Sequence, residues 1–284
     1  MRSLSLCIAF SLLSCGPADA PAAVQSAAPP AENAVSISAG ASYDFESPSA
    51  SVDLPEALRE ISGVTVLPDG RLAAVQDEAG VLFILDAESG AVLSEQPFAG
   101  PGDYEDVAHA AGAVWVLEAN GTLFEIPESG TAREHETPLK KKCDAEGLAF
   151  DSARSRLLIA CKEDPGEGFD EDEHRAVYAF DLATGSLLEE PVFLLQRSEL
   201  DSDDNFKPSA IGVHPLTGEI YVMSSVRRAI AILAPDGRLA RVVDLPAGRN
   251  AQPEGMAFLP DGTLFISNEG PDAPATLQRF APAR

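Results

Sequence analysis

A hairpin-sized segment that recurs along the chain constrains the fold more than any other feature. At 253–270, PEGMAFLPDGTLFISNEG, apolar residues alternate along two arms that flank Pro260-Asp261-Gly262. Proline fixes the φ angle needed at the first central position of a turn, and glycine tolerates the positive φ that follows. The segment therefore predicts a β-hairpin. Similar segments lie at 61–80, 103–121, 144–163 and 208–226.

A unit that repeats about every 40 residues indicates a β-propeller, because one small sheet cannot bury both of its faces alone. Each unit has room for four strands, so we expect an all-β fold with five four-stranded blades. The stretch 187–205 has room for a degenerate blade, which leaves six blades as an alternative. A chain of 284 residues, 45% of them hydrophobic, suffices for a core of this size.

The fifth unit is one strand short. It offers strands at 254–258, 263–266 and 276–280, whereas the other units offer four. The segment 43–54 has strand character but no partner beside it in the sequence. Pairing this segment with the fifth unit would complete the blade and cover two sheet edges. We therefore expect a ring that is closed by an N-terminal strand.

The N-terminus has the features of a lipoprotein signal peptide. Residues 1–14 combine Arg2 with an apolar run at 4–13 that is too short to span a bilayer. Cys15 follows the sequence LLS, which resembles a bacterial lipobox, where the cysteine becomes the lipidated N-terminus of the mature chain. Several acyl chains on one residue give stable anchoring. The alternative is an ordinary cleaved signal with a cysteine at this place by chance.

The lipobox has consequences for domain organisation and location. Residues 15–41 would form an Ala- and Pro-rich tether, and residues 42–284 the propeller domain. Gly16 follows Cys15, so nothing resembles an inner-membrane retention signal that uses aspartate. We therefore expect the protein in the cell envelope, on the periplasmic face of the outer membrane or on the cell surface. We expect a monomer that contacts the membrane only through its lipid anchor.

The charge of the chain excludes two classes of ligand. It has 45 acidic and 20 basic residues, a formal net charge of −25. Such a surface repels nucleic acid and anionic membrane surfaces, so we expect neither as a ligand. Cations and partners with basic faces remain. The alternative is that the acidic residues serve solubility or belong to a salt-tolerant, acidic proteome.

The four cysteines predict one disulfide. Cys7 lies in the signal peptide and Cys15 in the lipobox, which leaves Cys143 and Cys161. These two flank a hairpin whose midpoint is near Ser152, so they should face each other across strands about 5 Å apart. An exported protein can oxidise them. Two thiols without a nearby pair of histidines do not suit a zinc site.

Four stretches carry a resemblance to the SdiA-regulated domain family of bacterial exported propellers. They are CDAEGL at 143–148, LLIACKED at 157–164, FKPSAIGVHPLTGEIYVMSS at 206–225 and QPEGMAFLPDGTLFISNEG at 252–270. The resemblance covers about 58–280. It implies a propeller that is anchored to, or secreted beyond, the inner membrane, and it implies no established reaction. A weaker similarity links the chain to gluconolactonase-type and phytase-like propellers, which bind divalent metal at the channel mouth, although their fuller catalytic signatures are absent here.

Acidic residues are expected to gather at one mouth of the channel, defined as the face where innermost strands begin and second strands end. Converging carboxylates either have raised pKa values or hold a cation, and oxygen ligands suit Ca²⁺ or Mg²⁺. Because about one residue in six is acidic, a solvated acidic rim is the alternative. The candidate ligands are Glu60, Glu105, Glu146 and Glu254 at strand starts, where the fourth unit has Ser209, and Asp77, Glu118, Glu163, Asn268 and Glu269 at strand ends.

Two functions follow as hypotheses. The first is a surface-anchored binding or scaffold propeller for a small-molecule or protein ligand, with Ca²⁺ at the acidic mouth. The second is a metal-dependent hydrolase in which one mouth carboxylate is the general base. No Gly-x-Ser-x-Gly motif supports a serine triad, and His109 and His214 are interpreted as structural. The acidic loop 163–173 is interpreted as solvated, with further Ca²⁺ ligands as the alternative. The sequence does not decide whether the protein is an enzyme.

Overall fold

The computed structural model describes residues 41–139, 141–201 and 205–283. The signal peptide, Cys15 and the tether up to residue 40 lie outside the described residues. None of the helices in the described part of the chain is long and apolar enough to cross a membrane.

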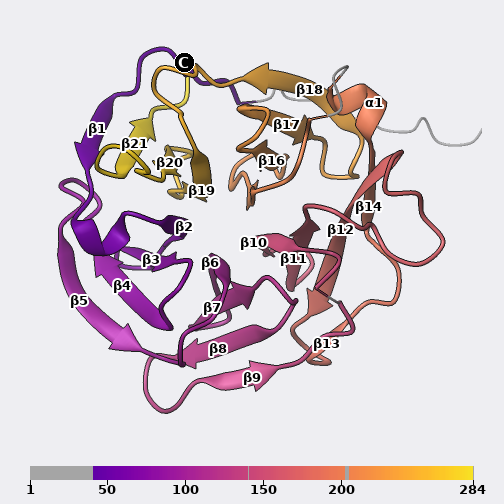
Figure 1. Cartoon of the computed structure of the whole chain (residues 1–284), viewed down its shortest axis with the longest axis horizontal. Coiled ribbons are helices and arrows are strands. Elements are labelled where there is room, and N and C mark those ends of the chain that lie inside the picture. The colour runs from indigo at the N-terminus through magenta and orange to yellow at the C-terminus, as the bar shows by residue number, and fades with distance from the viewer. Residues whose placement is uncertain (1–40, 140, 202–204, 284) are drawn as a thin grey trace, which may run out of the picture. The chain divides into compact units, whose positions relative to one another are not determined.

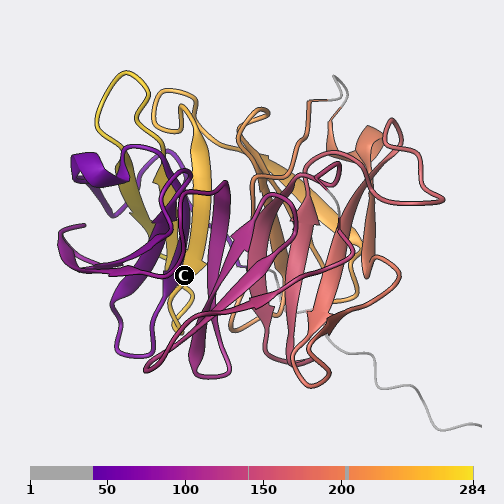
Figure 2. The same ribbon diagram turned by 60° about the horizontal axis from the view of Figure 1, so that its bottom comes forward.

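Five antiparallel sheets surround a common centre, which confirms the five-bladed propeller (Figure 1). Each innermost strand contacts the innermost strands of both neighbouring blades, so the ring is continuous. Figure 2 shows the same sheets from the side. Blade 1 contains β2 (Ile61–Val66), β3 (Leu72–Gln76), β4 (Val81–Leu85) and β5 (Val92–Pro97); blade 2 contains β6 (Tyr104–Ala110), β7 (Ala113–Glu118), β8 (Leu123–Pro127) and β9 (Arg133–His135); blade 3 contains β10 (Ala145–Asp151), β11 (Arg156–Cys161), β12 (His174–Asp181) and β13 (Ser186–Leu187), with β14 (Phe193–Gln196); blade 4 contains β15 (Ala210–Val213), β16 (Ile220–Ser224), β17 (Ala229–Leu233) and β18 (Leu239–Asp244); blade 5 contains β19 (Pro253–Phe258), β20 (Leu264–Asn268) and β21 (Thr276–Phe280).

The ring is closed by an N-terminal strand, as the sequence predicts. Strand β1 (Ala50–Asp53) pairs with β21 and completes blade 5 (Figure 1). The strand is shorter than the predicted 43–54. The residues before it contact the ring through their side chains and do not pair as a strand. The hydroxyl of Tyr43 donates a hydrogen bond to the carbonyl oxygen of Gly262 at 2.6 Å. Phe45 is buried against Phe280, with ring centroids 5.3 Å apart.

The stretch 187–205 does not form a sixth blade. Strands β13 and β14 both pair with β12, at different ends of it, so together they form the interrupted outer strand of blade 3. The short helix α1 (Arg197–Leu200) follows β14 directly. A three-residue 3₁₀ helix, Glu56–Leu58, joins β1 to blade 1. The alternative of six blades is therefore wrong.

The core consists of side chains between adjacent blades. The described residues contain a hydrophobic cluster at each of the five blade interfaces. Trp115 of blade 2 packs on Phe180 of blade 3, with ring centroids 5.8 Å apart. Burying an aromatic side chain of this kind contributes about 1.5–3 kcal/mol to stability. His214 is 2% exposed and its Nδ1 accepts hydrogen bonds from the backbone of its own turn, which fits a structural role.

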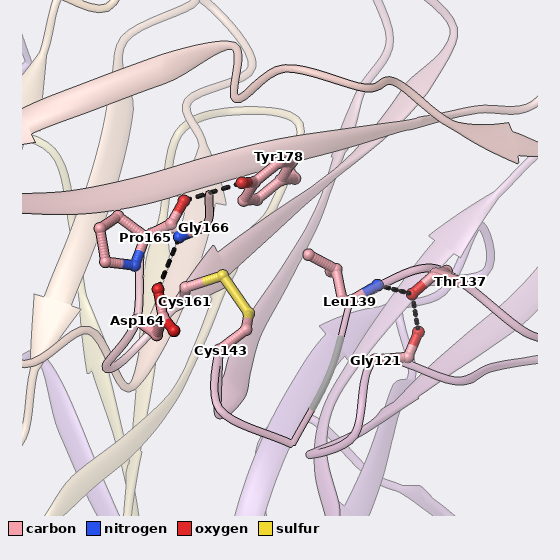
Figure 3. The surroundings of a disulfide bond; sticks show 9 residues. All are labelled: Gly121, Thr137, Leu139, Cys143, Cys161, Asp164, Pro165, Gly166 and Tyr178. Carbon is pink, nitrogen blue, oxygen red and sulfur yellow. Dashed lines mark hydrogen bonds between the residues drawn. A yellow bond between two sulfur atoms is a disulfide. The ribbon is translucent and has the colours of Figure 1, made fainter. Parts of the chain in front are cut away.

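The predicted disulfide is present. Cys143 and Cys161 are bonded, with Cα atoms 4.9 Å apart (Figure 3). Cys161 lies opposite Ala145 in the β10–β11 ladder, so Cys143 is beyond the end of that ladder rather than directly across from Cys161. The backbone continues the pairing here, because the N–H of Glu163 donates to the carbonyl of Cys143 at 3.1 Å. The bridge therefore joins the loop before β10 to the end of β11 on the mouth face.

Candidate binding site at the channel mouth

A β-bulge opens the innermost strand in four blades. In blade 3, Ala145 pairs with Cys161 and Gly147 with Ala160, so Glu146 between them is unpaired. A bulge redirects its extra residue and is common beside active sites. The same register shift occurs in blades 1, 2 and 5, and in blade 4 the corresponding residue directly precedes β15. The residues at this position are Ser62, Glu105, Glu146, Ser209 and Glu254.

The bulge corrects one assignment made from the sequence. Glu60 was expected to match Glu105, but the ladder places Ser62 at the equivalent position. Glu60 precedes the first residue of β2, two residues before the bulge. Ser62 donates a hydrogen bond to the carbonyl of Tyr104 at 2.6 Å, and Ser209 donates one to the carbonyl of Pro253 at 3.2 Å. Each serine hydroxyl therefore holds the residue that precedes a glutamate of the next blade.

The residue after the bulge brings neighbouring blades into close contact. A Cβ atom on Gly63 would lie 2.6 Å from the Cα of Asp106, so only glycine fits there. Asp106 is the equivalent residue of blade 2 and is 1% exposed. Its carboxyl group accepts hydrogen bonds from the N–H groups of Val107 at 2.8 Å and Leu148 at 2.7 Å. Burial raises the pKa of Asp106 well above its usual range. This carboxyl joins blades 2 and 3 and does not reach a serine or histidine.

The predicted mouth glutamates act on one another electrostatically. Burial raises the pKa of Glu105 to about 10, with further contributions from Glu146 and Asp103. Burial also raises the pKa of Glu146 to about 8, although Lys162 opposes the shift. The pKa of Glu254 is raised by burial too. Such shifts arise where carboxyl groups share a poorly solvated site. The bulge glutamates thus lie close enough to affect one another's pKa values.

A second acidic group joins blades 5 and 1. Burial raises the pKa of Glu269 to about 7, and Glu254, Asp77 and Glu60 add to the shift. The pKa of Asp77 is raised by burial and by Glu60. Glu60 therefore belongs to the mouth, although it is not a bulge residue.

Three other candidates lie apart from these groups. Glu163 is at the rim, where it forms an ion pair with Lys207. Asn268 is buried in blade 5, and its amide lies 3.5 Å from the side-chain oxygen of Asn250. The pKa of Tyr104 is raised mainly by burial, and Glu118 at the end of β7 raises it further. Glu118 therefore acts on Tyr104 rather than on a mouth glutamate. The structure therefore gives these three no contact with the bulge carboxyls.

Sequence reasoning missed the basic residues of the mouth. Lys162 directly follows Cys161 and forms an ion pair with Glu146. Burial lowers the pKa of Lys162, but Glu146, Asp144 and Glu254 raise it more, so it lies above the ordinary value. Lys162 follows β11 and Lys207 precedes β15, both on the mouth face. This position next to a strand is the sequence signal that could have revealed them.

The mouth contains a cavity of about 310 Å³ over blades 3, 4 and 5. This volume is at the lower end of the range for small-molecule sites. The amide of Gln252 also donates a hydrogen bond to Glu269, which links the cavity to the second acidic group. The residues that line it are Glu146, Lys162, Lys207, Ser209, Ser225, Val226, Arg228, Ala251, Gln252 and Glu254.

The acidic groups have the donor chemistry of a Ca²⁺ site but not its geometry. Among the described residues, no group of three or more His, Cys, Asp or Glu side chains is arranged to hold a metal ion. Glu146 is occupied by Lys162 and Glu269 by Gln252. A cation would have to displace these partners or draw further carboxyls together.

Comparisons with known proteins agree with this fold. The model of the SdiA-regulated family matches residues 41–274. No curated protein matches the chain. Similar solved structures include a streptogramin B lyase, at 16% identity and TM-score 0.51 over 82% of this chain and 97% of that one. A putative gluconolactonase has 16% identity and TM-score 0.54, over 80% and 77%. The Myxococcus xanthus glutaminyl cyclase has 14% identity and TM-score 0.57, over 84% and 97%. At such identities the likeness shows the fold alone.

Proposed function

The chain belongs to the SdiA-regulated family, and from this premise and the geometry of the mouth we propose that it is a binding module of the cell envelope. Its ligand is a small polar molecule that occupies the cavity beside Glu146 and Glu254. The observation that carries the proposal is the convergence of poorly solvated carboxyl groups around that cavity. Such groups are costly in an empty site, and a ligand that hydrogen-bonds or neutralises them lowers this cost.

The serine contacts support binding over covalent catalysis. A serine nucleophile needs a base within hydrogen-bond reach of its hydroxyl. Ser62 and Ser209 donate to backbone carbonyls of the neighbouring blade, and Ser209 also lies within hydrogen-bond reach of the carboxyl group of Glu254. His109 and His214 lie at the far ends of their strands, away from the mouth. A binding role therefore accounts for more of the site than a serine hydrolase does.

Export and lipid anchoring belong to the same proposal. The Cys143–Cys161 bridge supports an oxidising compartment, because structural disulfides are rare in reducing ones. The lipobox at Cys15 supports attachment through acyl chains. We place the propeller in the periplasm or at the cell surface, held there by its N-terminal residues.

A divalent cation is a further part of the proposal. Glu60, Asp77 and Glu269 form the acidic group with no ion-pair partner among the described residues, and their oxygens suit Ca²⁺. Because the present arrangement does not fit a metal ion, no step of the binding depends on one.

A hydrolase is the second candidate, favoured by one observation. The pKa of Glu146 is raised to about 8, by burial above all, and a general base works best when its pKa is near the operating pH. In this reading Glu146 would accept a proton from water beside a lactone or phosphoester. Lys162 would then keep the carboxylate in place.

Native mass spectrometry of the protein purified from its own cell envelope tests the proposal. Glu88 is exposed in the β4–β5 turn, at the end of blade 1 away from the mouth, so Glu88→Gln is the control. Wild type and Glu88→Gln should retain a small molecule that Glu254→Gln loses. A ligand retained equally by all three would place the site elsewhere. Turnover of a lactone, carboxyl ester or phosphoester that Glu146→Gln abolishes would replace the binding module with the hydrolase.

A further inference from the structure

We infer that the ligand of the mouth cavity carries an anionic group, a carboxylate or a phosphate, which Lys207 and Arg228 hold. The inference rests on the proposed function, because it takes the cavity to be the ligand site. It adds the charge of the ligand and the residues that recognise it. An acidic chain of formal net charge −25 would not be expected to bind an anion, so the local composition of the cavity carries the argument.

The cavity is basic within an acidic protein. Its lining contains Lys162, Lys207 and Arg228, against the two carboxyl groups of Glu146 and Glu254. The whole chain has 45 acidic and 20 basic residues, so the ratio is reversed here. The raised pKa of Glu254, caused by burial, lowers the negative charge of the lining further. Anions are thus attracted locally.

Arg228 is the basic residue without a carboxylate partner. Its guanidinium forms no ion pair or hydrogen bond with any residue that the structure describes, whereas the neighbouring Arg227 binds Asp201 at 3.2 Å and Asp244 at 2.9 Å. Arginine offers a planar pair of donors that match a carboxylate or phosphate. Arg228 is exposed, so its donors are available to a ligand with such a group.

The backbone at Arg228 is held in an unfavourable conformation. Its φ is +49°, in the left-handed region that side chains other than glycine rarely adopt. The turn between β16 and β17 is fixed by the N–H of Arg228 to the carbonyl of Ser225 at 3.2 Å, and by the N–H of Leu245 to the carbonyl of Arg228 at 2.8 Å. Ala111, Asp144 and Ser155 have nearly the same φ, so the conformation belongs to a tight turn, and this turn fixes where Arg228 leaves the backbone.

Lys207 can exchange its partner at low cost. Its ion pair with Glu163 is about one-third exposed on both sides, and such pairs contribute little to stability. The backbone of Lys207 is fixed by a hydrogen bond from its N–H to the hydroxyl of Ser224 at 2.9 Å. A ligand anion could thus replace Glu163 while the lysine keeps its place. The hydroxyl of Ser225 lines the same cavity and adds a neutral donor.

The surroundings limit the ligand to one anionic group. Lys162, the remaining basic residue of the described lining, is paired with Glu146, so it is not free to hold a second negative charge. A cavity of about 310 Å³ also suits a small molecule rather than a polyanion. The remaining part of the ligand is neutral or cationic, which suits the glutamates that face it.

Titration of isotope-labelled protein with acetate and with inorganic phosphate, followed by NMR, tests the inference. Saturable shifts should appear at Lys207 and at the Ser225–Arg228 turn, and the tighter of the two probes identifies carboxylate or phosphate. Arg228→Gln and Lys207→Gln should each weaken binding at least tenfold, whereas Arg238→Gln, an exposed control in the β17–β18 turn, should not. Absence of saturable shifts at high-millimolar probe, or equal binding by Arg228→Gln, overturns it.

The two proposals can fail separately. If a neutral or cationic molecule occupies the cavity and depends on Glu254 while neither anion binds, the anion site is wrong and the binding module stands. If both anions bind at Arg228 but the retained envelope ligand does not depend on Glu254, the anion site stands and the proposed function is wrong.

Discussion

The ammonium group of Lys162 is paired with the carboxylate of Glu146 at the mouth of the channel, one residue after the disulfide-bonded Cys161. Glu146 is in the β10 bulge and Lys162 follows the neighbouring strand β11, so the bulge and the disulfide together set their positions. Burial opposes charge on both side chains, yet the contact keeps the lysine charged.

Replacing Glu146 with glutamine should lower the pKa of Lys162. Glu146 is the largest contributor that raises that pKa, and without it the effect of burial dominates. Titration of the lysine side chain by NMR measures the shift, with Glu88→Gln as the control. An unchanged pKa in Glu146→Gln would mean that the two side chains are not paired in solution.

The stability of the folded chain should fall as the pH rises from about 5 to about 9. The pKa values of Glu146 and Glu269 are raised from 4.5 to about 8 and about 7, mainly by burial. The folded state therefore binds more protons than the unfolded state in this window, so stability is greatest below pH 4.5 to 5 and is lost above the raised values. At about 1.4 kcal/mol per pKa unit, the fall should be on the order of several kcal/mol.

Urea unfolding at several pH values measures this dependence. Glu269→Gln should flatten the curve between pH 5 and 7, and Glu146→Gln should flatten it between pH 5 and 8. A stability that rises across the same window would contradict the buried carboxyl groups.

Reduction of Cys143–Cys161 should destabilise the protein and loosen the mouth. The bridge closes a loop of 18 residues in sequence separation, for which chain entropy gives about 3 kcal/mol. Denaturant unfolding of the oxidised chain and of Cys143→Ser/Cys161→Ser measures the difference. Because Lys162 adjoins the bridge, amide exchange should also quicken at residues 162–164. Equal stability and equal exchange in both forms would show that the bridge does not position the mouth.

Removal of β1 should open the ring. A chain that begins at Leu54 lacks the strand that covers the edge of β21, and it should lose several kcal/mol or aggregate. A chain that begins at Ala50 keeps the strand but loses the packing of Tyr43 and Phe45, so its stability should be intermediate. A chain that begins at Ala41 should match the mature protein. Equal cooperative melting of the shortest and longest chains would refute closure by β1.

The fold could be predicted because its signals are local. The turn at Pro260-Asp261-Gly262 and its counterparts mark each hairpin, and the missing strand of the fifth unit shows where 43–54 belongs. The sequence does not distinguish an outer strand of blade 3 that is interrupted between β13 and β14 from a degenerate sixth blade. Both arrangements produce short apolar runs in the sequence.

The site was predicted less completely because its determinants act between blades. A bulge has no clear sequence signature, and blade 1 has a serine rather than an acidic residue in it, so the nearby Glu60 was assigned to the position that Ser62 occupies. The pairing of Lys207 with Glu163 joins residues 44 apart in sequence, and no periodicity reveals it. The position of Arg228 at the cavity likewise depends on a turn whose conformation only the structure gives.

The central claim is that the mouth cavity is the ligand site, and calorimetry with a panel of small polar molecules tests it most directly. Wild type and Glu88→Gln should bind at least one member equally, while Glu254→Gln and Arg228→Gln bind it at least tenfold more weakly. Binding of every active molecule with the same affinity by all four proteins would contradict the claim.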